Sequence, residues 1–129
     1  MEQLSAIQLR DAFLKGDYTA VAITRFYLKR IETYDSQIGA FLQVYEEKAL
    51  EQAEKLDEKR RNGEKLGKLA AVPFAIKANI LIKGEITSCA SRFLTNYRAP
   101  YNATAIDLLL EEDAILIGQT NMDEFAMGS

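Results

Sequence analysis

The chemistry open to this chain is limited first by the residue types that it lacks. Its 129 residues include no histidine, which excludes Ser–His–Asp and Cys–His mechanisms, imidazole metal sites and histidine pH switches for this chain alone. Its one cysteine, Cys89, can form neither an internal disulfide nor a thiolate zinc site. This cysteine usage is typical of a reducing, intracellular setting. The candidates that remain are a lysine, the cysteine itself and carboxylates.

One lysine is distinguished by its apolar surroundings. Lys77 is the only charged residue between positions 69 and 82, and it directly follows an apolar run that is rich in strand formers. A lysine is almost never fully buried without a partner, and burial without an anion disfavours its ammonium form. Two interpretations stay open: Lys77 lays its stem over apolar surface with its ammonium in water, or it is a functional base.

The other candidates have simpler structural explanations. Cys89 has no histidine and no visible cation beside it to stabilise a thiolate, which favours packing. Asp123 and Glu124 could form a pair of acid and base carboxylates, yet adjacent side chains diverge by about 100° on a helix and face opposite sides of a strand. Isolated glycines such as Gly84 and Gly118 give no loop that could cradle a phosphate.

The first half of the chain has the periodicity of helices. Ser5 and Gln8 fit a capping box, and the helix that they open should end at Gly16. A second helix should begin at Asp17 or Thr19, because apolar residues then recur along one stripe. The stripe consists of Ile23, Tyr27, Ile31 and Tyr34.

A third helix is predicted from about Tyr45 to the turn at Asn62 and Gly63. Its apolar face would consist of Ala49, Ala53 and Leu56. Fourteen of the 23 residues at positions 46–68 are charged and of mixed sign, which is typical of a solvated helix face.

After position 69 the pattern changes to that of an α/β fold. Residues 69–76 form an apolar run typical of a strand, and residues 79–82 continue its apolar character. Residues 102–112 indicate a helix that Asn102 or Thr104 should cap, with an inward face of Ile106, Leu109 and Leu110. This helix leads directly into a buried strand at residues 114–118, and helix followed by strand is the unit of parallel α/β sheets.

The overall composition excludes several classes of protein. A net charge of −3 and a pI near 5.1 give no positive field for binding nucleic acid by this chain alone. The first nine residues lack the pattern of a signal peptide, and no stretch without charge is long enough to span a bilayer. We therefore expect a cytoplasmic protein without a membrane partner.

Four segments resemble the amidase signature family. They are residues 69–80 (LAAVPFAIKANI), 87–91 (TSCAS), 101–104 (YNAT) and 117–129 (IGQTNMDEFAMGS). Within that family, the segments TNMDEFAMGS and SCAS are similar to the A subunits of glutamyl-tRNA(Gln) amidotransferases. The resemblance implies a mixed-sheet α/β fold that is incomplete in this chain. Residues 1–129 would be a partial domain, with a helical part at 1–68 and the start of the α/β core at 69–129.

The resemblance implies a Ser–cis-Ser–Lys mechanism of amide hydrolysis. In the family a serine attacks the amide, a second serine relays its proton and a neutral lysine is the base, which is the position that Lys77 matches. The family places both serines and their Gly-Ser-rich loop beyond Ser129, so we expect this chain alone to be inactive. A partial domain would also leave a sheet edge uncovered, so we expect marginal stability or aggregation of the isolated chain.

The closing segment supplies the remaining site candidates. By resemblance, Met127, Gly128 and Ser129 match a stretch beside the substrate, although core packing is an equal alternative for Met127. Glu124 is a candidate for lining an ammonia path, and Ser129 is not expected to act as a nucleophile. Ala78 is a departure, because the family normally has aspartate after the lysine.

The resemblance also implies partners. The parent enzyme would hydrolyse glutamine and pass ammonia to B and C subunits in a heterotrimer, which converts Glu-tRNA(Gln) to Gln-tRNA(Gln) for protein synthesis. The B subunit would use ATP and magnesium, the complex would bind the tRNA, and no cofactor or metal would be held by this chain. The alternatives are a stand-alone amidase and a non-catalytic remnant that acts only as an interaction surface.

Overall fold

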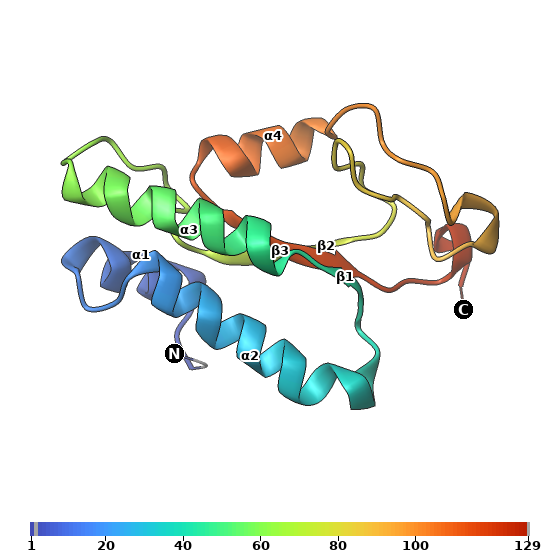
Figure 1. Ribbon diagram of the computed structural model, residues 1–129, viewed down its shortest axis with the longest axis horizontal. Coiled ribbons are helices and arrows are strands. Elements are labelled where there is room, and N and C mark those ends of the chain that lie inside the picture. Colours follow the sequence, from blue (N-terminus) through green and yellow to red (C-terminus); the bar gives the residue numbers. More distant parts are fainter. Residues whose placement is uncertain (2, 129) are drawn as a thin grey trace.

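The computed structural model describes residue 1 and residues 3–128, which form a mixed α/β fold with a three-stranded sheet (Figure 1). The elements, in chain order, are α1 (Ala6–Lys15), α2 (Ala20–Ile38), β1 (Phe41–Val44), α3 (Glu46–Arg61), β2 (Pro73–Lys77), η1 (Arg92–Leu94), α4 (Thr104–Glu111), β3 (Ile115–Thr120) and η2 (Glu124–Ala126). No helix among the described residues has the length and apolar character needed to cross a membrane.

The predicted caps of the first two helices are confirmed. Ser5 Oγ accepts from the Gln8 amide at 3.3 Å, and Gln8 Oε1 accepts from the Ser5 amide at 2.8 Å. Helix α1 then ends at Gly16, whose φ of 86° is left-handed. Thr19 caps α2 by accepting from the Ala22 amide at 3.0 Å, so the second helix starts after Thr19.

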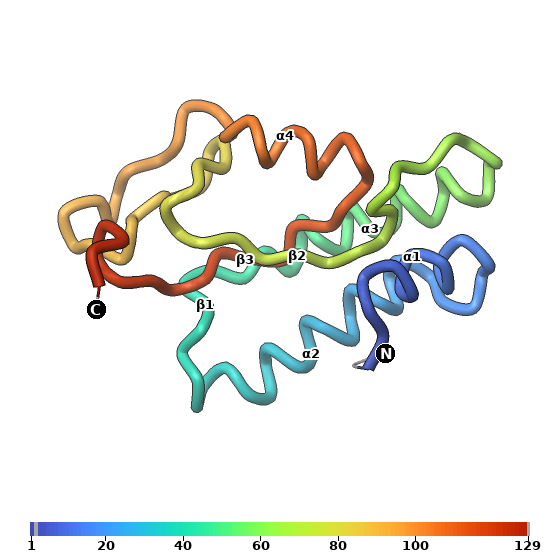
Figure 2. The backbone as a smooth tube through the Cα atoms, turned by 180° about the vertical axis from the view of Figure 1, so that it is seen from behind, coloured from blue at the N-terminus to red at the C-terminus, as the bar shows by residue number. Residues whose placement is uncertain are grey.

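Helices cover both faces of the sheet. Figures 1 and 2 show α4 on one side and α1 and α2 on the other. Ile115 and Ile117 of β3 join the apolar cluster of α1, α2 and α3, whereas Leu116 joins the cluster that includes Ile106 of α4. Because β3 is buried on both faces, its first three residues, Ile115–Ile117, form an apolar run, as in strands of parallel sheets.

The sheet has the strand order β1-β3-β2, with β2 parallel and β1 antiparallel to β3. β1 was not predicted, since it falls within the part of the chain that has helical periodicity. Its four residues alternate between half-buried and exposed, a pattern too short to read from sequence. Close pairing depends on Gly118, where a Cβ atom would lie 2.4 Å from the Gln43 carbonyl oxygen.

Two predicted boundaries differ from the structure. β2 begins at Pro73, because residues 69–72 form turns and Ala71 has a φ of 61°, which interrupts an extended strand. α4 has Ala103 at its N-cap without a side-chain bond, so neither predicted cap residue acts there. Asn102 instead accepts from the Lys83 amide and donates to Asp107, both at 2.7 Å, which ties the helix to the preceding loop.

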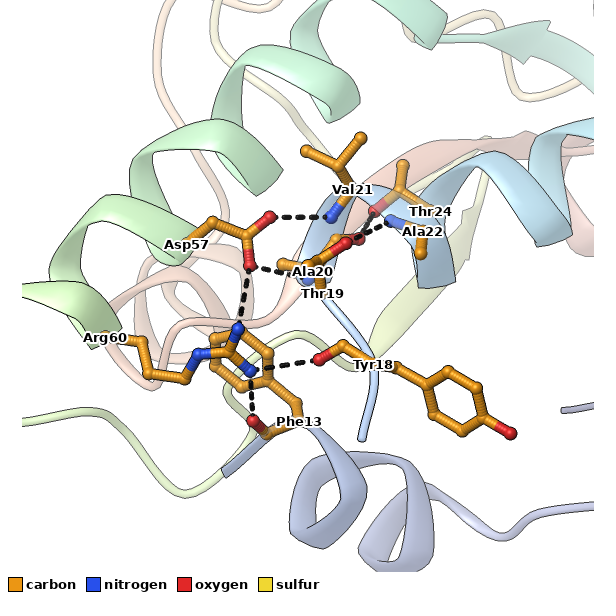
Figure 3. Close-up of polar contacts among 9 residues, drawn as sticks. All are labelled: Phe13, Tyr18, Thr19, Ala20, Val21, Ala22, Thr24, Asp57 and Arg60. Carbon is orange, nitrogen blue, oxygen red and sulfur yellow. Dashed lines mark hydrogen bonds and ion pairs between the residues drawn. The ribbon is translucent and has the colours of Figure 1, made fainter. Parts of the chain in front are cut away.

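A polar cluster joins the ends of α1, α2 and α3 (Figure 3). The Asp57 carboxylate accepts from the Ala20 amide at 2.8 Å and from the Val21 amide at 3.1 Å, so α3 caps α2. The Arg60 guanidinium lies 4.5 Å from the Phe13 ring centroid and donates to the carbonyl oxygens of Phe13 and of Tyr18. These contacts hold the three helices together. The side chains that make them belong to the charged segment that was predicted to be a solvated helix face.

The Gln52 side chain of α3 bonds to the backbone of β3 and the residue before it, beyond the point where β1 ends. Its Nε2 donates to the Ala114 carbonyl oxygen at 2.7 Å, and its Oε1 accepts from the Leu116 amide at 3.4 Å. The side chain thus satisfies two backbone groups that a neighbouring strand would otherwise pair.

Replacing Gln52 with leucine should lower the free energy of unfolding by about 1–3 kcal/mol, because both backbone groups lose their partner. Denaturant unfolding measures this change. Glu54→Leu, on the exposed face of the same helix, is the matched control and should change stability by less than about 0.5 kcal/mol. Equal effects of the two variants would contradict the role given to the Gln52 amide.

Tyr45 gives the fold a dependence on alkaline pH. Burial, and to a smaller degree the Glu85 carboxylate, raises the pKa of its hydroxyl well above the ordinary value of 10.0. Above pH 10 the unfolded chain therefore loses a proton that the folded chain keeps, so stability falls as pH rises through this range. Denaturant unfolding between pH 8 and pH 11 should show a shallower fall for Tyr45→Phe than for the natural chain. An unchanged slope would exclude Tyr45 as the titrating group.

Candidate active site at the carboxyl ends of the parallel strands

The candidate site lies where the two parallel strands end. Lys77, the last residue of β2, pairs with Thr120, the last residue of β3. The Ala78 amide donates to the Thr120 carbonyl oxygen at 3.1 Å, and Thr120 Oγ1 donates to the Ile76 carbonyl oxygen at 3.2 Å. Lys77 is therefore fixed at the carboxyl edge of the sheet, which is where open α/β sheets bind their ligands.

The side chain of Lys77 is exposed, although its sequence neighbours are apolar. β2 is an edge strand of the described sheet, and its buried side chains, Ile76 and the following Ala78, alternate with the exposed Ala75 and Lys77. Only one face of the strand is therefore buried. Among the described residues no carboxylate lies within ion-pair distance of the Lys77 ammonium.

Two distant segments meet beside this strand end. The Cys89 amide donates to the Ala78 carbonyl oxygen at 3.0 Å, and the Phe125 amide donates to the Cys89 carbonyl oxygen at 3.0 Å. Ser91 Oγ donates to Glu124 Oε1 at 2.6 Å. Residues 88–91 and 123–127 are thus held against each other and against the residue that follows Lys77. The structure brings together three of the sequence segments that carried the family resemblance.

Backbone strain is concentrated in these two segments. Cys89, Ala90, Phe125 and Ala126 have φ between 50° and 58°, and only two other non-glycine residues in the described part of the chain have positive φ. Each such residue costs about 1–3 kcal/mol. Strain of this kind gathers at functional sites, where the surrounding structure holds it in place. Its location here supports a functional site at the ends of β2 and β3.

The other predicted site residues differ in their placement. Glu124 is at the junction through its bond to Ser91, whereas Met127 is 80% exposed, so the described residues do not bury it in a core. A Cβ on Gly128 would meet the Asp123 carboxylate, which shows that Asp123 turns towards Gly128. Asp123 and Glu124 therefore have different neighbours and do not form a carboxylate pair. Ser129 lies outside the described residues.

Sequence reasoning missed three buried polar residues near the site. Ser91, Thr87 and Gln119 are only 5%, 2% and 1% exposed. Gln119 could have been noticed as a polar side chain in an otherwise apolar strand, whereas the burial of Ser91 and Thr87 depends on how their loop folds over the sheet. Among the described residues no group of three or more His, Cys, Asp or Glu side chains could hold a metal ion.

Known proteins share both the sequence and this arrangement. A family described as amidase matches residues 22–129, which is most of the chain. The chain belongs to the amidase family. Two relatives are A subunits of glutamyl-tRNA(Gln) amidotransferase: that of Protochlamydia amoebophila (strain UWE25) is 60% identical and that of Chlamydia abortus (strain DSM 27085 / S26/3) is 51% identical, each over 129 residues. The matches cover 100% of this chain and 26% of each relative, so the chain spans about a quarter of their length.

Solved structures of amidases share the fold. Native peptide amidase from Stenotrophomonas maltophilia is 28% identical with a TM-score of 0.89, over 95% of this chain and 26% of that one. A fatty acid amide hydrolase has a TM-score of 0.89 over 96% of this chain and 22% of its own, and its 19% identity makes it similar in fold alone. The predicted α/β fold of the amidase signature type is confirmed.

Proposed function

We propose that this chain is the lysine-bearing part of the glutaminase subunit of a glutamyl-tRNA(Gln) amidotransferase. The observation that supports this most is 60% identity along all 129 residues to the A subunit of such an enzyme. The position of Lys77 at the carboxyl end of a parallel strand, beside two strained segments, supports a catalytic site in this region. The parts of the reaction that this chain lacks would come from the rest of the length that its relatives have.

In the proposed reaction, glutamine is hydrolysed to glutamate and ammonia. A serine oxygen attacks the amide carbon, and its proton passes through a second serine to the neutral amine of Lys77. The same proton then returns through the second serine to the amide nitrogen, so that the C–N bond breaks and ammonia leaves, and water hydrolyses the acyl-serine to release glutamate. Both serines would lie in protein outside residues 1–129. A lysine accepts a proton only in its neutral form, so further protein must cover the exposed Lys77 before it can act as the base.

The proposed partners follow from the same assignment. B and C subunits would receive the ammonia and amidate Glu-tRNA(Gln). The B subunit would use ATP and magnesium, while the complex as a whole would bind the tRNA. The compartment would be the cytoplasm. By resemblance, Met127, Gly128 and Ser129 would border the glutamine, and Glu124 would border the path of the ammonia.

A chimera tests the function. Residues 1–129 replace the matching residues of the P. amoebophila A subunit, and the product is combined with that organism's B and C subunits. The expected result is glutamine-dependent conversion of Glu-tRNA(Gln) to Gln-tRNA(Gln) in the presence of ATP. The 129-residue chain alone should release no ammonia from glutamine. A chimera that works with ammonium chloride and fails with glutamine would overturn the proposal.

A non-catalytic role is the second candidate, and one observation favours it. Ala78 follows the lysine where the family normally has aspartate, which is a change next to the proposed base. The chimera separates the two functions. An assembled complex without glutaminase activity would identify residues 1–129 as an interaction surface. The stand-alone amidase alternative would show amide hydrolysis without any need for B and C subunits.

A further inference from the structure

A short hydrogen bond between two side chains joins distant segments at the candidate site. The buried Ser91 Oγ donates to Glu124 Oε1 at 2.6 Å, a length typical of a hydroxyl bonded to a carboxylate, and such bonds are stronger than those between neutral groups. The same Oγ accepts from the Phe93 amide at 3.3 Å, which fixes the direction of the hydroxyl. Figures 1 and 2 show η1, which Ser91 caps, beside η2, which begins at Glu124.

The bond holds a turn whose backbone is strained. Phe125 and Ala126 of η2 have left-handed φ values of 52° and 58°, which side chains of this kind rarely adopt. Bonds inside the turn, such as that from the Met127 amide to the Glu124 carbonyl oxygen at 3.1 Å, set its shape but do not attach it to the sheet. The turn therefore needs contacts from outside to keep its conformation and its position.

Two bonds attach the turn to the rest of the site. One is the bond between Ser91 and Glu124, and the other runs from the Phe125 amide to the Cys89 carbonyl oxygen at 3.0 Å. The Cys89 amide in turn donates to the carbonyl oxygen of the residue that follows Lys77. A single bond would let the turn pivot about Cys89, whereas two bonds fix its orientation relative to the end of β2.

We propose that Ser91 and Glu124 are positioning residues that form a clasp, and that this clasp keeps the glutamine site assembled beside Lys77. The proposed function, on which the identity of the ligand rests, places Met127 and Gly128 along the glutamine, and both directly follow the strained residues of the turn. Without the clasp the turn occupies this position for only part of the time, and the affinity for glutamine falls by that fraction. The clasp therefore acts on glutamine binding more than on the chemical step.

Kinetics of the chimera test the clasp. In Ser91→Ala and in Glu124→Ala the KM for glutamine should rise about tenfold, the usual effect of one hydrogen bond to a charged group, while kcat for ammonia release changes by less than about threefold. The double variant should have the same KM as each single variant, because either change opens the clasp. Glu124 is exposed, so Glu124→Ala should fold and decides the test even if Ser91→Ala does not fold. An unchanged KM in Glu124→Ala overturns the inference.

Two further variants make the result specific to the bond. Glu124→Gln keeps an oxygen that can accept from Ser91 but loses the charge, so its KM should lie between those of Glu124→Ala and the unsubstituted chimera. Thr95→Ala is the matched control, since it removes a hydroxyl that bonds only to the Arg92 carbonyl oxygen within its own loop, and its KM should be unchanged. If Glu124 acted only along the path of the ammonia, its variants would transfer less ammonia to Glu-tRNA(Gln) at an unchanged KM, which would also overturn the clasp.

Amide hydrogen exchange of the 129-residue chain tests the clasp without glutamine. In Glu124→Ala the Phe125 amide, which bonds to Cys89, should exchange at least about tenfold faster, while the amides of α1 keep their rates. Thr95→Ala should change neither. Equal acceleration of all amides, or no acceleration, overturns the clasp. A chimera without glutaminase activity before any further substitution contradicts the proposed function instead, and the exchange rates still decide whether the clasp holds the turn.

Discussion

Replacing Lys77 with alanine in the chimera should lower the rate of glutamine hydrolysis by about 10³-fold, the usual contribution of a general base. Glutamine-dependent formation of Gln-tRNA(Gln) should fall equally, because ammonia is no longer released. The fold should persist, since the Lys77 side chain is exposed at the end of an edge strand. Initial rates of ammonia release, with circular dichroism of the same samples, measure both effects.

Two controls make the result specific to the base. Lys83→Ala removes another exposed lysine six residues later and should leave the rate unchanged. Lys77→Arg keeps the charge but cannot give up its proton, so it should be as inactive as Lys77→Ala. Ammonium chloride should restore Gln-tRNA(Gln) formation in both Lys77 variants. Hydrolysis at the parental rate by Lys77→Ala would contradict the role of Lys77.

Local sequence patterns predicted the helices well. Each of the first three is set by residues within a few positions of one another: the Ser5 capping box, the Thr19 cap and the alanine face of α3. The buried strand β3 was also predicted, because its first half packs against apolar neighbours on both faces and is apolar at every position. These features depend on local spacing, which a single sequence contains.

Features that depend on tertiary pairing were not predicted. β1 exists because Gly118 lets its backbone approach β3, and its own four residues carry little signal. The exposure of Lys77 depends on the face of β2 that carries Ala75 and Lys77 being left uncovered by the described residues, which an apolar run cannot reveal. The partners of Ser91 and Asp57 lie 33 and 37 residues away, so no local pattern identifies them. The candidate site was predicted at Lys77 by resemblance, and its strained surroundings came from the structure.

Replacing Asp57 with alanine should lower the free energy of unfolding by about 3 kcal/mol, among the largest effects of a single side chain in this fold. The carboxylate is 14% exposed, accepts from two backbone amides at the start of α2 and lies 3.8 Å from the Arg60 guanidinium. Its removal leaves both amides without their acceptor and takes the opposite charge away from the Arg60 guanidinium, which keeps only the carbonyl oxygens of Phe13 and Tyr18. Denaturant unfolding of the natural chain and the variant measures the loss.

The Asp57 prediction separates capping from charge pairing. Asp57→Asn keeps one oxygen for the Ala20 amide but removes the charge that faces Arg60, so its loss should lie between those of Asp57→Ala and the natural chain. Thr19→Ala, which removes a single cap bond of the same helix, should cost about 1 kcal/mol. Glu58→Ala, on the exposed face one position away, should change stability by less than about 0.5 kcal/mol. If Asp57→Ala cost no more than Glu58→Ala, the Asp57 carboxylate would contribute nothing to joining α2 and α3, and this junction would depend on the contacts of Arg60 and on apolar packing.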